Sequence, residues 1–234
     1  MSVAATTMQT ETVIALGGVD FIADVSGALF EPATRTLIVA DCHFEKGSAF
    51  TRLGHVLPPF DTRDTLIRLE ALALRFRPKA IVSLGDGFHD RAAALRLSED
   101  DVARLCTLGR QADLIWIAGN HDPEPVSALP GLSVIELALG GIMLRHAPGG
   151  AGDYEIAGHL HPVAKIAGRG RAVRRRCFVS DGRRCILPAF GAYTGGLNIL
   201  DEAVAPYLAR ETWRIHAIGR ERLYGIAPAL LLND

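Results

Sequence analysis

The sequence predicts an α/β protein in which two β-sheets pack together and helices lie outside them. Up to about residue 120, segments typical of strands alternate with segments typical of helices, which is the pattern of a layered α/β architecture. From Leu132 onward, short apolar runs are separated by Gly and Pro with little helical periodicity, which is typical of an antiparallel sheet. Since no linker, repeat or low-complexity tract divides the chain, we expect one domain over residues 1–234.

The first half contains a hairpin, three strands and two helices in our prediction. Residues 1–10 are small and polar and are expected to be flexible, and residues 12–30 form a hairpin around Gly17-Gly18. Strands are expected at 36–40, 80–84 and 114–118, with a long loop at 44–59. A helix over 61–75 has Asp61 or Thr62 as its cap, and a second helix begins after Ser98, which is followed by three acidic residues. The strands expected in the second half are 132–139, 142–146, 156–159, 172–179, 184–188, 197–200, 207–209 and 212–218.

The overall composition is that of an ordinary globular protein and excludes a few function classes. Of 234 residues, 49% are hydrophobic and 22% are charged, and the formal net charge is -1, so only local clustering of charge can indicate a nucleic-acid partner. No apolar run approaches the roughly 18 residues needed to cross a bilayer, and no basic segment followed by an apolar core opens the chain. The four cysteines form no CxxC pair; we expect free thiols, with a disulfide between Cys177 and Cys185 as the less favoured alternative, and a cytoplasmic location.

Polar metal-binding residue types end four of the predicted strands. Asp41 and His43 follow the apolar run 36–40, and in an extended segment residues i and i+2 point the same way, so we expect both side chains to converge. Three later runs end in Gly85-Asp86, in Gly119-Asn120-His121-Asp122 and in Gly158-His159-Leu160-His161. Four strand ends of this kind are hard to explain by packing.

The donor types indicate divalent ions. Carboxylate and amide oxygens bind hard cations, and imidazole suits first-row transition ions. His146, after the run 142–145, is a further candidate, although a structural histidine is the alternative there. The candidate metal ligands are Asp41, His43, Asp86, Asn120, His146, His159 and His161. Seven groups are too many for one structural zinc but suit two ions that share a bridging carboxylate, which is the arrangement used in phosphoryl chemistry. His121 then remains free to protonate a leaving oxygen.

These motifs, in this order, resemble those of the calcineurin-like metallophosphoesterase superfamily over residues 36–165. The resemblance implies a four-layer αββα sandwich, two mixed β-sheets flanked by helices, with a two-metal site at the strand ends. It also implies that Asp41, His43 and His161 hold one ion, that Asp86 bridges, that Asn120, His146 and His159 hold the other, and that His121 acts on the phosphate.

A narrower resemblance covers residues 12–210. The segments 41–48, 57–62, 84–90 and 187–196 are similar to those of the bacterial ligase-associated DNA damage response endonuclease family. This resemblance implies an Mn²⁺-dependent phosphodiesterase and DNA endonuclease that acts in repair, with a DNA ligase, an exonuclease and a helicase as partners.

Basic residues near the strand ends are candidates for substrate contacts. Seven arginines lie between residues 169 and 184 against one acid, Asp181, and Arg174, Arg175 and Arg176 are consecutive. Arginine binds phosphate through two parallel hydrogen bonds, so the cluster favours a DNA backbone; a solvated hairpin is the alternative. His89 and Arg145 are further substrate-binding candidates, for which structural roles are also open.

Three functions are consistent with these motifs. The first is hydrolysis of phosphodiester bonds in DNA, and the second is hydrolysis of small phosphodiesters or nucleotides with the same metal site. The third is a non-catalytic scaffold, against which the presence of His121 argues.

Overall fold

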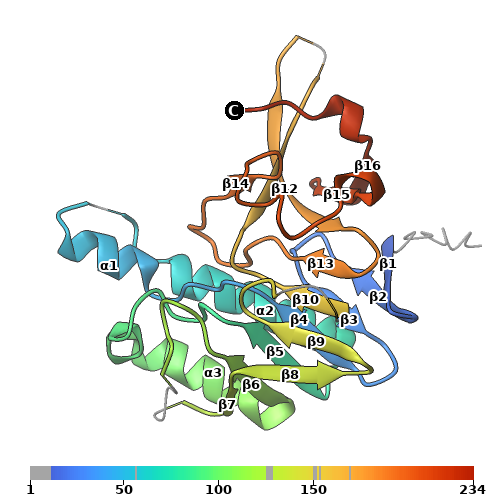
Figure 1. The fold of residues 1–234 in the computed structure, drawn as a ribbon. Coiled ribbons are helices and arrows are strands. Elements are labelled where there is room, and N and C mark those ends of the chain that lie inside the picture. Colours follow the sequence, from blue (N-terminus) through green and yellow to red (C-terminus); the bar gives the residue numbers. More distant parts are fainter. Residues whose placement is uncertain (1–11, 56, 125–128, 150–151, 153, 169) are drawn as a thin grey trace, which may run out of the picture.

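The computed structural model describes residues 12–55, 57–124, 129–149, 152, 154–168 and 170–234. Segment 1–10, for which we expected flexibility, and Arg169 of the arginine cluster lie outside these residues. Two mixed β-sheets pack against each other, and helices cover the first sheet (Figure 1). The predicted fold class, an α/β sandwich of two mixed β-sheets, is confirmed, with the helices on the first sheet.

The first sheet combines an antiparallel and a parallel half. Its strands, in spatial order, are β1 (Thr12–Leu16), β2 (Val19–Ala23), β3 (Leu29–Glu31), β4 (Thr36–Val39), β5 (Ala80–Leu84), β6 (Asp113–Ile117) and β7 (Leu132–Val134). The first four strands pair antiparallel, and β4 to β7 pair parallel. Because parallel strands end at the same edge of a sheet, the motifs after β4, β5 and β6 are brought together there.

The second sheet is also mixed, as the resemblance implies, whereas the apolar runs of the second half predict an antiparallel sheet. In spatial order its strands are β14 (Leu197–Asn198), β11 (Pro162–Ile166), β12 (Val173–Ser180), β13 (Arg184–Ile186), β10 (Tyr154–Ala157), β9 (Ile142–Arg145) and β8 (Glu136–Leu139); β15 (Arg214–Ile218) pairs with β12, and β16 (Leu223–Ile226) pairs with β15. Strand β10 pairs parallel to both β9 and β13, and β11 pairs parallel to β14. Alternation of apolar residues identifies a strand but does not determine the direction of its neighbour. Residues 207–209 are not a strand, and β11 and β16 were not predicted.

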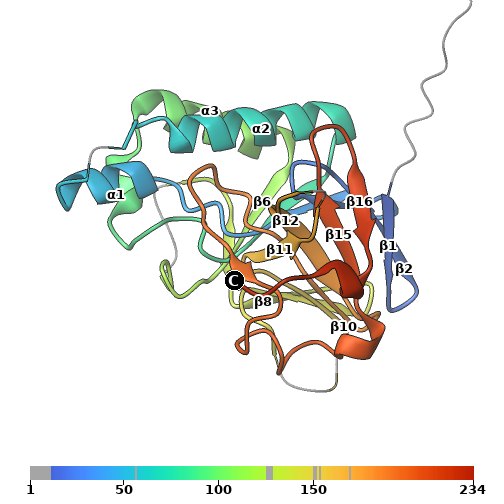
Figure 2. The same ribbon diagram turned by 90° about the horizontal axis from the view of Figure 1, so that it is seen from above.

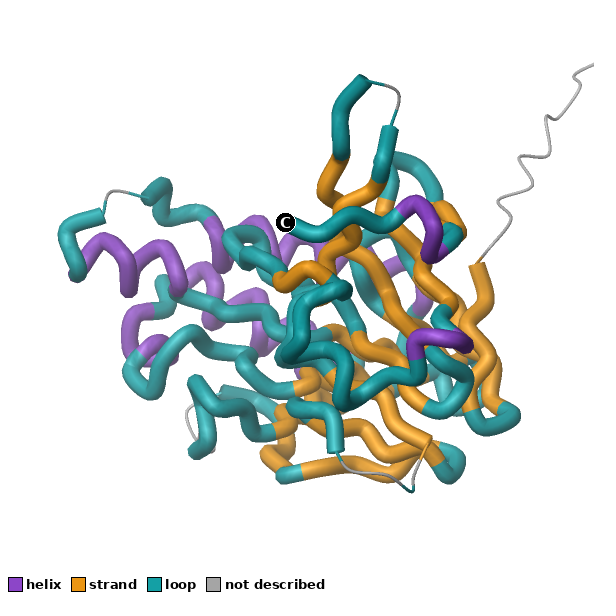
Figure 3. The backbone as a smooth tube through the Cα atoms, turned by 45° about the horizontal axis from the view of Figure 1, so that its top comes forward, coloured by secondary structure: helices purple, strands orange, loops and turns teal. Residues whose placement is uncertain are grey.

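The helices α1 (Lys46–Arg52), α2 (Asp61–Phe76) and α3 (Glu99–Gln111) lie on one side of the molecule (Figure 2). Leu66, Leu69 and Leu72 of α2 pack on the first sheet with Leu105 and Leu108 of α3, as the helical spacing predicts. In Figure 3 the strands gather on the opposite side from these helices.

Local capping agrees with the sequence at one helix and differs at another. The Ser98 hydroxyl accepts a hydrogen bond from the Asp101 backbone N–H at 3.2 Å, so the predicted cap of α3 is confirmed. The N-cap of α2 is Phe60, not Asp61 or Thr62, because the Asp61 carboxylate instead accepts from the Gly47 backbone N–H at 2.9 Å. That contact orders the segment expected to be a loop, which contains α1.

Two further apolar layers complete the core. Ile38 and Val82 of the first sheet pack on Leu144 and Ile156 of the second, and each fully buried side chain of this size contributes about 1.5–3 kcal/mol. The outer face of the second sheet packs against residues 199–213, which contain a short 3₁₀ turn, Arg210–Thr212. Along the part of the chain that the structure describes, no α-helix covers that face, so the second helical layer of the implied αββα arrangement is replaced by these residues.

The cysteines are free thiols, as predicted. Cys177 packs in the outer layer, whereas Cys185 packs between the sheets, so the two side chains lie on opposite faces of the second sheet and do not meet. Among the described residues, no helix combines the length and the apolar character that crossing a membrane requires.

Candidate metal centre

The segments that follow β4, β5, β6, β9 and β10 meet where the two sheets adjoin. Backbone hydrogen bonds join them: the His43 N–H donates to the Asp86 carbonyl at 2.9 Å, and the Gly158 N–H donates to the His146 carbonyl at 2.9 Å. The His159 N–H donates to the Asp41 carboxylate at 2.9 Å. All seven predicted ligand residues lie in these segments, so the structure brings them to one place.

The backbone of this region is held in an unusual conformation. Six non-glycine residues have φ between 43° and 68°, in the left-handed region: Asp41, His43, Glu45, Asp86, His159 and His161. Such residues cost about 1–3 kcal/mol each and persist where the surrounding structure imposes them, as at functional sites. Asp41 and His43 do converge, but not as residues i and i+2 of an extended strand, as we predicted. They lie beyond β4 and converge through alternating left-handed residues.

A first group of donors is formed by Asp41, His43 and His161. The Nε2 atoms of the two histidines lie 3.3 Å apart, and His161 Nε2 lies 3.5 Å from Asp41 Oδ1. Their ligand atoms all lie within 4.8 Å of one another, close enough to share one ion. Burial, reinforced by the neighbouring imidazole of His161, lowers the pKa of His43 to about 2, so its ring is neutral and able to bind a metal.

A second group is formed by Asp86, His146 and His159, with Asn120 beside them. His146 Nε2 lies 2.8 Å from Asn120 Oδ1, 3.1 Å from His159 Nδ1 and 3.5 Å from Asp86 Oδ1. Asp86 also faces the first group, because its Oδ2 lies 3.9 Å from His43 Nε2. One carboxylate thus lies between the two groups.

The donor chemistry at His146 fits a cation. Its Nδ1–H donates to the Leu84 carbonyl at 3.0 Å, which leaves Nε2 with a lone pair in the neutral ring. That lone pair faces the Asn120 carbonyl oxygen, another acceptor, so a positive ion between them satisfies both atoms. The structure therefore contains His and Asp clusters able to hold divalent metal.

Two motif glycines are required by close packing of the ligands. A Cβ on Gly85 would lie 2.4 Å from the His146 ring, and φ there is +70°. A Cβ on Gly158 would lie 2.5 Å from Asp41 Oδ2. The glycine before each ligand in the Gly-Asp and Gly-His motifs thus allows a ligand from another segment to approach.

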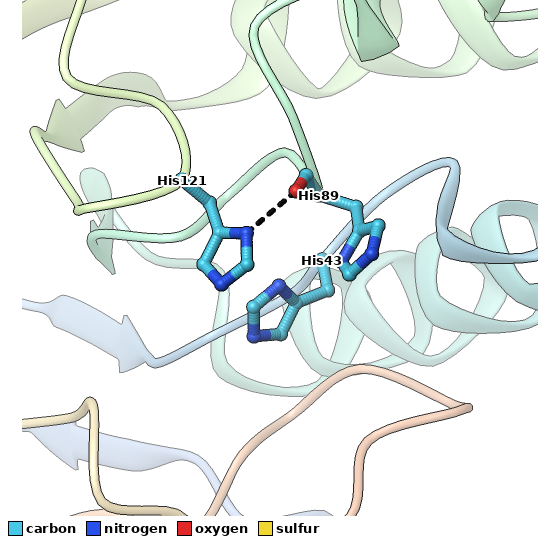
Figure 4. Close-up of side chains that lie close together, drawn as sticks. All are labelled: His43, His89 and His121. Carbon is cyan, nitrogen blue, oxygen red and sulfur yellow. Dashed lines mark hydrogen bonds between the residues drawn. The ribbon is translucent and has the colours of Figure 1, made fainter. Parts of the chain in front are cut away.

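His121 lies beside the first group, together with His89. Figure 4 shows both rings near His43, with the His121 Nδ1–H donating to the His89 carbonyl at 2.7 Å. This hydrogen bond directs Nε2 of His121 toward Asp86 Oδ2, 3.9 Å away. The rings of His43, His89 and His121 also form a third set of nearby imidazoles.

Asp122, the last residue of the Gly-Asn-His-Asp motif, connects two of these segments, a role that the sequence analysis missed. Its carboxylate accepts from the backbone N–H groups of Phe88 at 2.9 Å and Gly119 at 3.1 Å. Burial raises the pKa of Asp122 to about 6, against the effect of these two donors. The signal was available in the sequence, since Asp122 ends the most distinctive of the four motifs.

The candidate substrate contacts have different surroundings. The Arg145 guanidinium lies 3.1 Å from Glu136 and 3.3 Å from Glu155, so it joins β8, β9 and β10. Arg184 is buried and paired with Glu155, so it is not part of a surface cluster. The ion pairs of Arg145 with Glu136 and Glu155 favour the structural alternative for Arg145.

Arg174, Arg175 and Arg176 lie on β12. Arg174 and Arg175 are exposed, and Arg174 is 2.5 Å from Asp234, whereas half-buried Arg176 donates to the Ala189 carbonyl at 2.7 Å. Ala189 lies two residues before Gly191, whose backbone N–H donates to the Asp41 carbonyl at 3.1 Å, so this segment is close in space to the candidate metal centre. The arginines therefore border the segment that packs on the candidate metal centre.

Comparison with known proteins agrees with this arrangement. A family model described as calcineurin-like phosphoesterase matches residues 34–171, which contain every candidate ligand. The chain belongs to the calcineurin-like phosphoesterase family. As a member, it is a metal-dependent phosphoesterase, and the predicted superfamily and enzyme class are confirmed.

Solved structures give a more specific likeness. The crystal structure of Pseudomonas putida nuclease MPE has 29% identity to this phosphoesterase and a TM-score of 0.72, and it covers 92% of this chain and 100% of its own. It is consistent with the narrower resemblance to ligase-associated endonucleases. A phosphoesterase from E. coli, Yfce, has 15% identity and a TM-score of 0.41. The match covers 82% of this chain and 98% of the E. coli chain. No curated protein matches the sequence.

Proposed function

We propose that this phosphoesterase hydrolyses phosphodiester bonds in DNA with two divalent ions, for which Mn²⁺ is the first candidate. The observation that carries the proposal is the position of Asp86 between two groups of donors, 3.9 Å from His43 and 3.5 Å from His146. A carboxylate between two sets of imidazoles suits a bridging ligand of a two-metal site.

Each ion has its own proposed ligands. Asp41, His43 and His161 hold one ion, Asn120, His146 and His159 hold the other, and Asp86 contacts both. When bound, such ions lower the pKa of water and neutralise charge on a phosphate. Mixed nitrogen and oxygen donors accept several first-row ions, and Mn²⁺ is proposed from the resemblance to ligase-associated endonucleases.

His121 is the proposed general acid. Its Nδ1–H is committed to the His89 carbonyl, so Nε2 is the nitrogen that can carry a proton to the leaving oxygen. Its side chain is 39% exposed, so a substrate can reach it, whereas Asp86 is 4% exposed. Because the His89 carbonyl also orients this ring, His89 is proposed as a substrate-side residue of the centre.

A basic groove supports DNA as the substrate. It is lined by Arg174, Arg175, Arg176 and Arg220 with one acid, Glu221, and has a volume of about 970 Å³. Arginines in such a groove bind phosphate oxygens without regard to base sequence. The similar Pseudomonas putida protein is a nuclease, which also favours DNA.

The cellular setting follows from the same resemblance. We place the enzyme in DNA repair, with a ligase, an exonuclease and a helicase as partners, and treat residues 1–234 as one domain. The four free cysteines favour a reducing compartment such as the cytoplasm.

A small-molecule phosphodiesterase is the second candidate, because the metal centre itself does not distinguish a DNA backbone from a small diester. The structural feature that favours DNA is the arginine groove, which lies outside the centre.

The test is nicking of supercoiled plasmid by metal-stripped protein after Mn²⁺ is added back, with Asp86→Ala as the control. Nicking by the wild type and none by the variant is the expected result. If neither protein nicks the plasmid but the wild type hydrolyses bis-p-nitrophenyl phosphate, the small-molecule function replaces the DNA function.

A further inference from the structure

Neighbouring flat rings connect the proposed general acid to helix α1. The His121 and His89 rings are nearly parallel, at 23°, with centroids 5.2 Å apart. The centroid of the Phe50 ring lies 5.9 Å from that of His89, with the two rings tilted by 36°, and the centroid of the His55 ring lies 6.1 Å from that of Phe50. This row of rings therefore begins at the proposed general acid.

Burial distinguishes Phe50 from phenylalanines that serve packing. Phe44 and Phe88, from the same two segments, are 1% and 2% exposed and pack on each other in the core. Phe50 and His89 are only half-buried, and His55 is exposed. A ring whose purpose was core packing would be covered in the same way as Phe44, so Phe50 has surface left for a ligand.

The row is held rigidly against the metal centre. The Arg96 Nε–H donates to the Ser48 hydroxyl at 2.8 Å, and Arg96 also pairs with Asp90 at 2.7 Å. These contacts join α1 to the segment that carries His89, so Phe50 is fixed relative to His121 before any substrate arrives. Such preorganisation lowers the entropic cost of binding.

A cation accompanies the rings. Lys46 Nζ lies 5.9 Å from the centroid of the Phe50 ring. The nearby carboxylate of Asp61 favours the charged form of Lys46, against the effect of burial, which lowers the pKa of Lys46. Flat rings with a cation beside them are the elements with which proteins bind the bases and the backbone of a nucleic-acid strand. The charge of Lys46 complements a phosphate next to a stacked base.

We propose that Phe50 is a base-binding residue: an unpaired nucleobase next to the scissile phosphate stacks on Phe50 and His89, and Lys46 contacts the adjoining phosphate. The inference rests on the proposed DNA function and deepens it, since it names the part of the substrate that the rim of the site recognises. Phe50 is a specificity residue, because it contacts the base and not the reacting atoms.

The experiment compares two short single-stranded oligonucleotides, one with normal bases and one with abasic sugars on both sides of the cleavage position. Phe50→Ala is expected to lower kcat/KM for the normal oligonucleotide roughly 5- to 100-fold and to leave the abasic one unchanged. Phe50→Leu, which keeps apolar bulk without a flat ring, shows most of the same loss. Phe60→Ala, which removes another exposed phenyl ring at the start of α2, is the matched control and is expected to cleave both oligonucleotides normally.

Binding provides a second readout. The affinity of metal-free protein for the fluorescein-labelled normal oligonucleotide, measured by anisotropy, falls for Phe50→Ala and not for Phe60→Ala. Equal losses on both oligonucleotides, or no loss on either, overturn the role of Phe50 while wild-type cleavage of DNA upholds the proposed function. A wild type that nicks supercoiled plasmid but cleaves neither oligonucleotide overturns this inference and upholds the DNA function. A wild type that cleaves neither the oligonucleotides nor the plasmid but hydrolyses bis-p-nitrophenyl phosphate overturns both.

Discussion

The Nε2 atoms of His43 and His161 lie 3.3 Å apart although 118 residues separate them in the chain. His43 follows the first sheet and His161 precedes β11 of the second, so the pair joins the two halves of the sandwich. Asp41, which accepts the His159 backbone N–H, belongs to the same group. An ion bound by this group would link the two sheets in addition to any catalytic role.

Metal binding is therefore expected to stabilise the fold. An ion at 100 times its dissociation constant adds about 2.7 kcal/mol, which raises the Tm of a chain of this size by roughly 5–10 °C. Differential scanning fluorimetry of EDTA-treated protein with and without Mn²⁺ measures this shift. His161→Ala is expected to lose much of the shift, and an equal shift in the variant would contradict the assignment of His161.

Gly158→Ala is expected to damage the metal centre through one methyl group. The added Cβ would lie 2.5 Å from Asp41 Oδ2 and 2.9 Å from the Ala40 side chain, so Asp41 must move. Metal content by atomic absorption should fall while far-ultraviolet circular dichroism stays as in the wild type. Gly170→Ala, where the Cβ has open space, is a control for the methyl group itself, although its positive φ adds backbone strain. Full metal content in Gly158→Ala would show that metal binding does not require Asp41 at its present position.

Asp122→Asn is expected to lower activity without removing a ligand. The carboxylate accepts from the Phe88 and Gly119 backbone N–H groups, and the amide can accept at only one of its two ends. The unpaired N–H costs about 1–3 kcal/mol and loosens the segments that carry Asp86 and Asn120. Chemical denaturation measures the stability loss, and hydrolysis of bis-p-nitrophenyl phosphate measures the activity; an unchanged denaturation midpoint would argue against this connecting role.

Replacing Arg174, Arg175 and Arg176 together with alanine is expected to weaken DNA binding and its salt dependence. Each lost phosphate contact reduces the slope of log K against log salt by about 0.7 for a single strand and about 0.9 for a duplex. Fluorescence anisotropy over a range of salt concentrations measures both quantities. The triple variant of Arg63, Arg104 and Arg110, on α2 and α3, changes the net charge equally and is expected to bind as the wild type does. If both triple variants weaken binding alike, the groove has no specific part in it.

Thiol labelling is expected to reach Cys106 first. Burial raises the pKa of Cys42 and of Cys185 to about 12 and raises the pKa of Cys177 further, so these three thiols are protonated and covered at neutral pH. Cys106 on α3 is partly exposed. Mass spectrometry after iodoacetamide treatment should find one modified site in native protein and four after unfolding. Rapid native labelling of Cys177 would contradict the packing of the outer layer.

The identity of the candidate ligands could be predicted because each sits in a short motif at the end of an apolar run. Asp41, Asp86 and Asn120 follow parallel strands, whose ends meet at one edge, so local pattern and sheet geometry lead to the same place. Helix α2 could be predicted because its apolar residues recur at regular helical spacing over a long segment.

Strand direction, helix α1 and the roles of individual arginines depended on contacts between distant segments. The parallel pairing of β10, the burial of Arg184 against Glu155 and the Asp61–Gly47 hydrogen bond all join residues whose proximity no local pattern contains. Residue types and their spacing thus decide which chemistry is possible, because ligand atoms and apolar periods are local properties. Only the folded chain decides which of these residues lie close enough to share an ion, because contacts between segments far apart in the sequence, such as the hydrogen bond from the His43 N–H to the Asp86 carbonyl, hold the left-handed backbone at Asp41, His43 and Asp86.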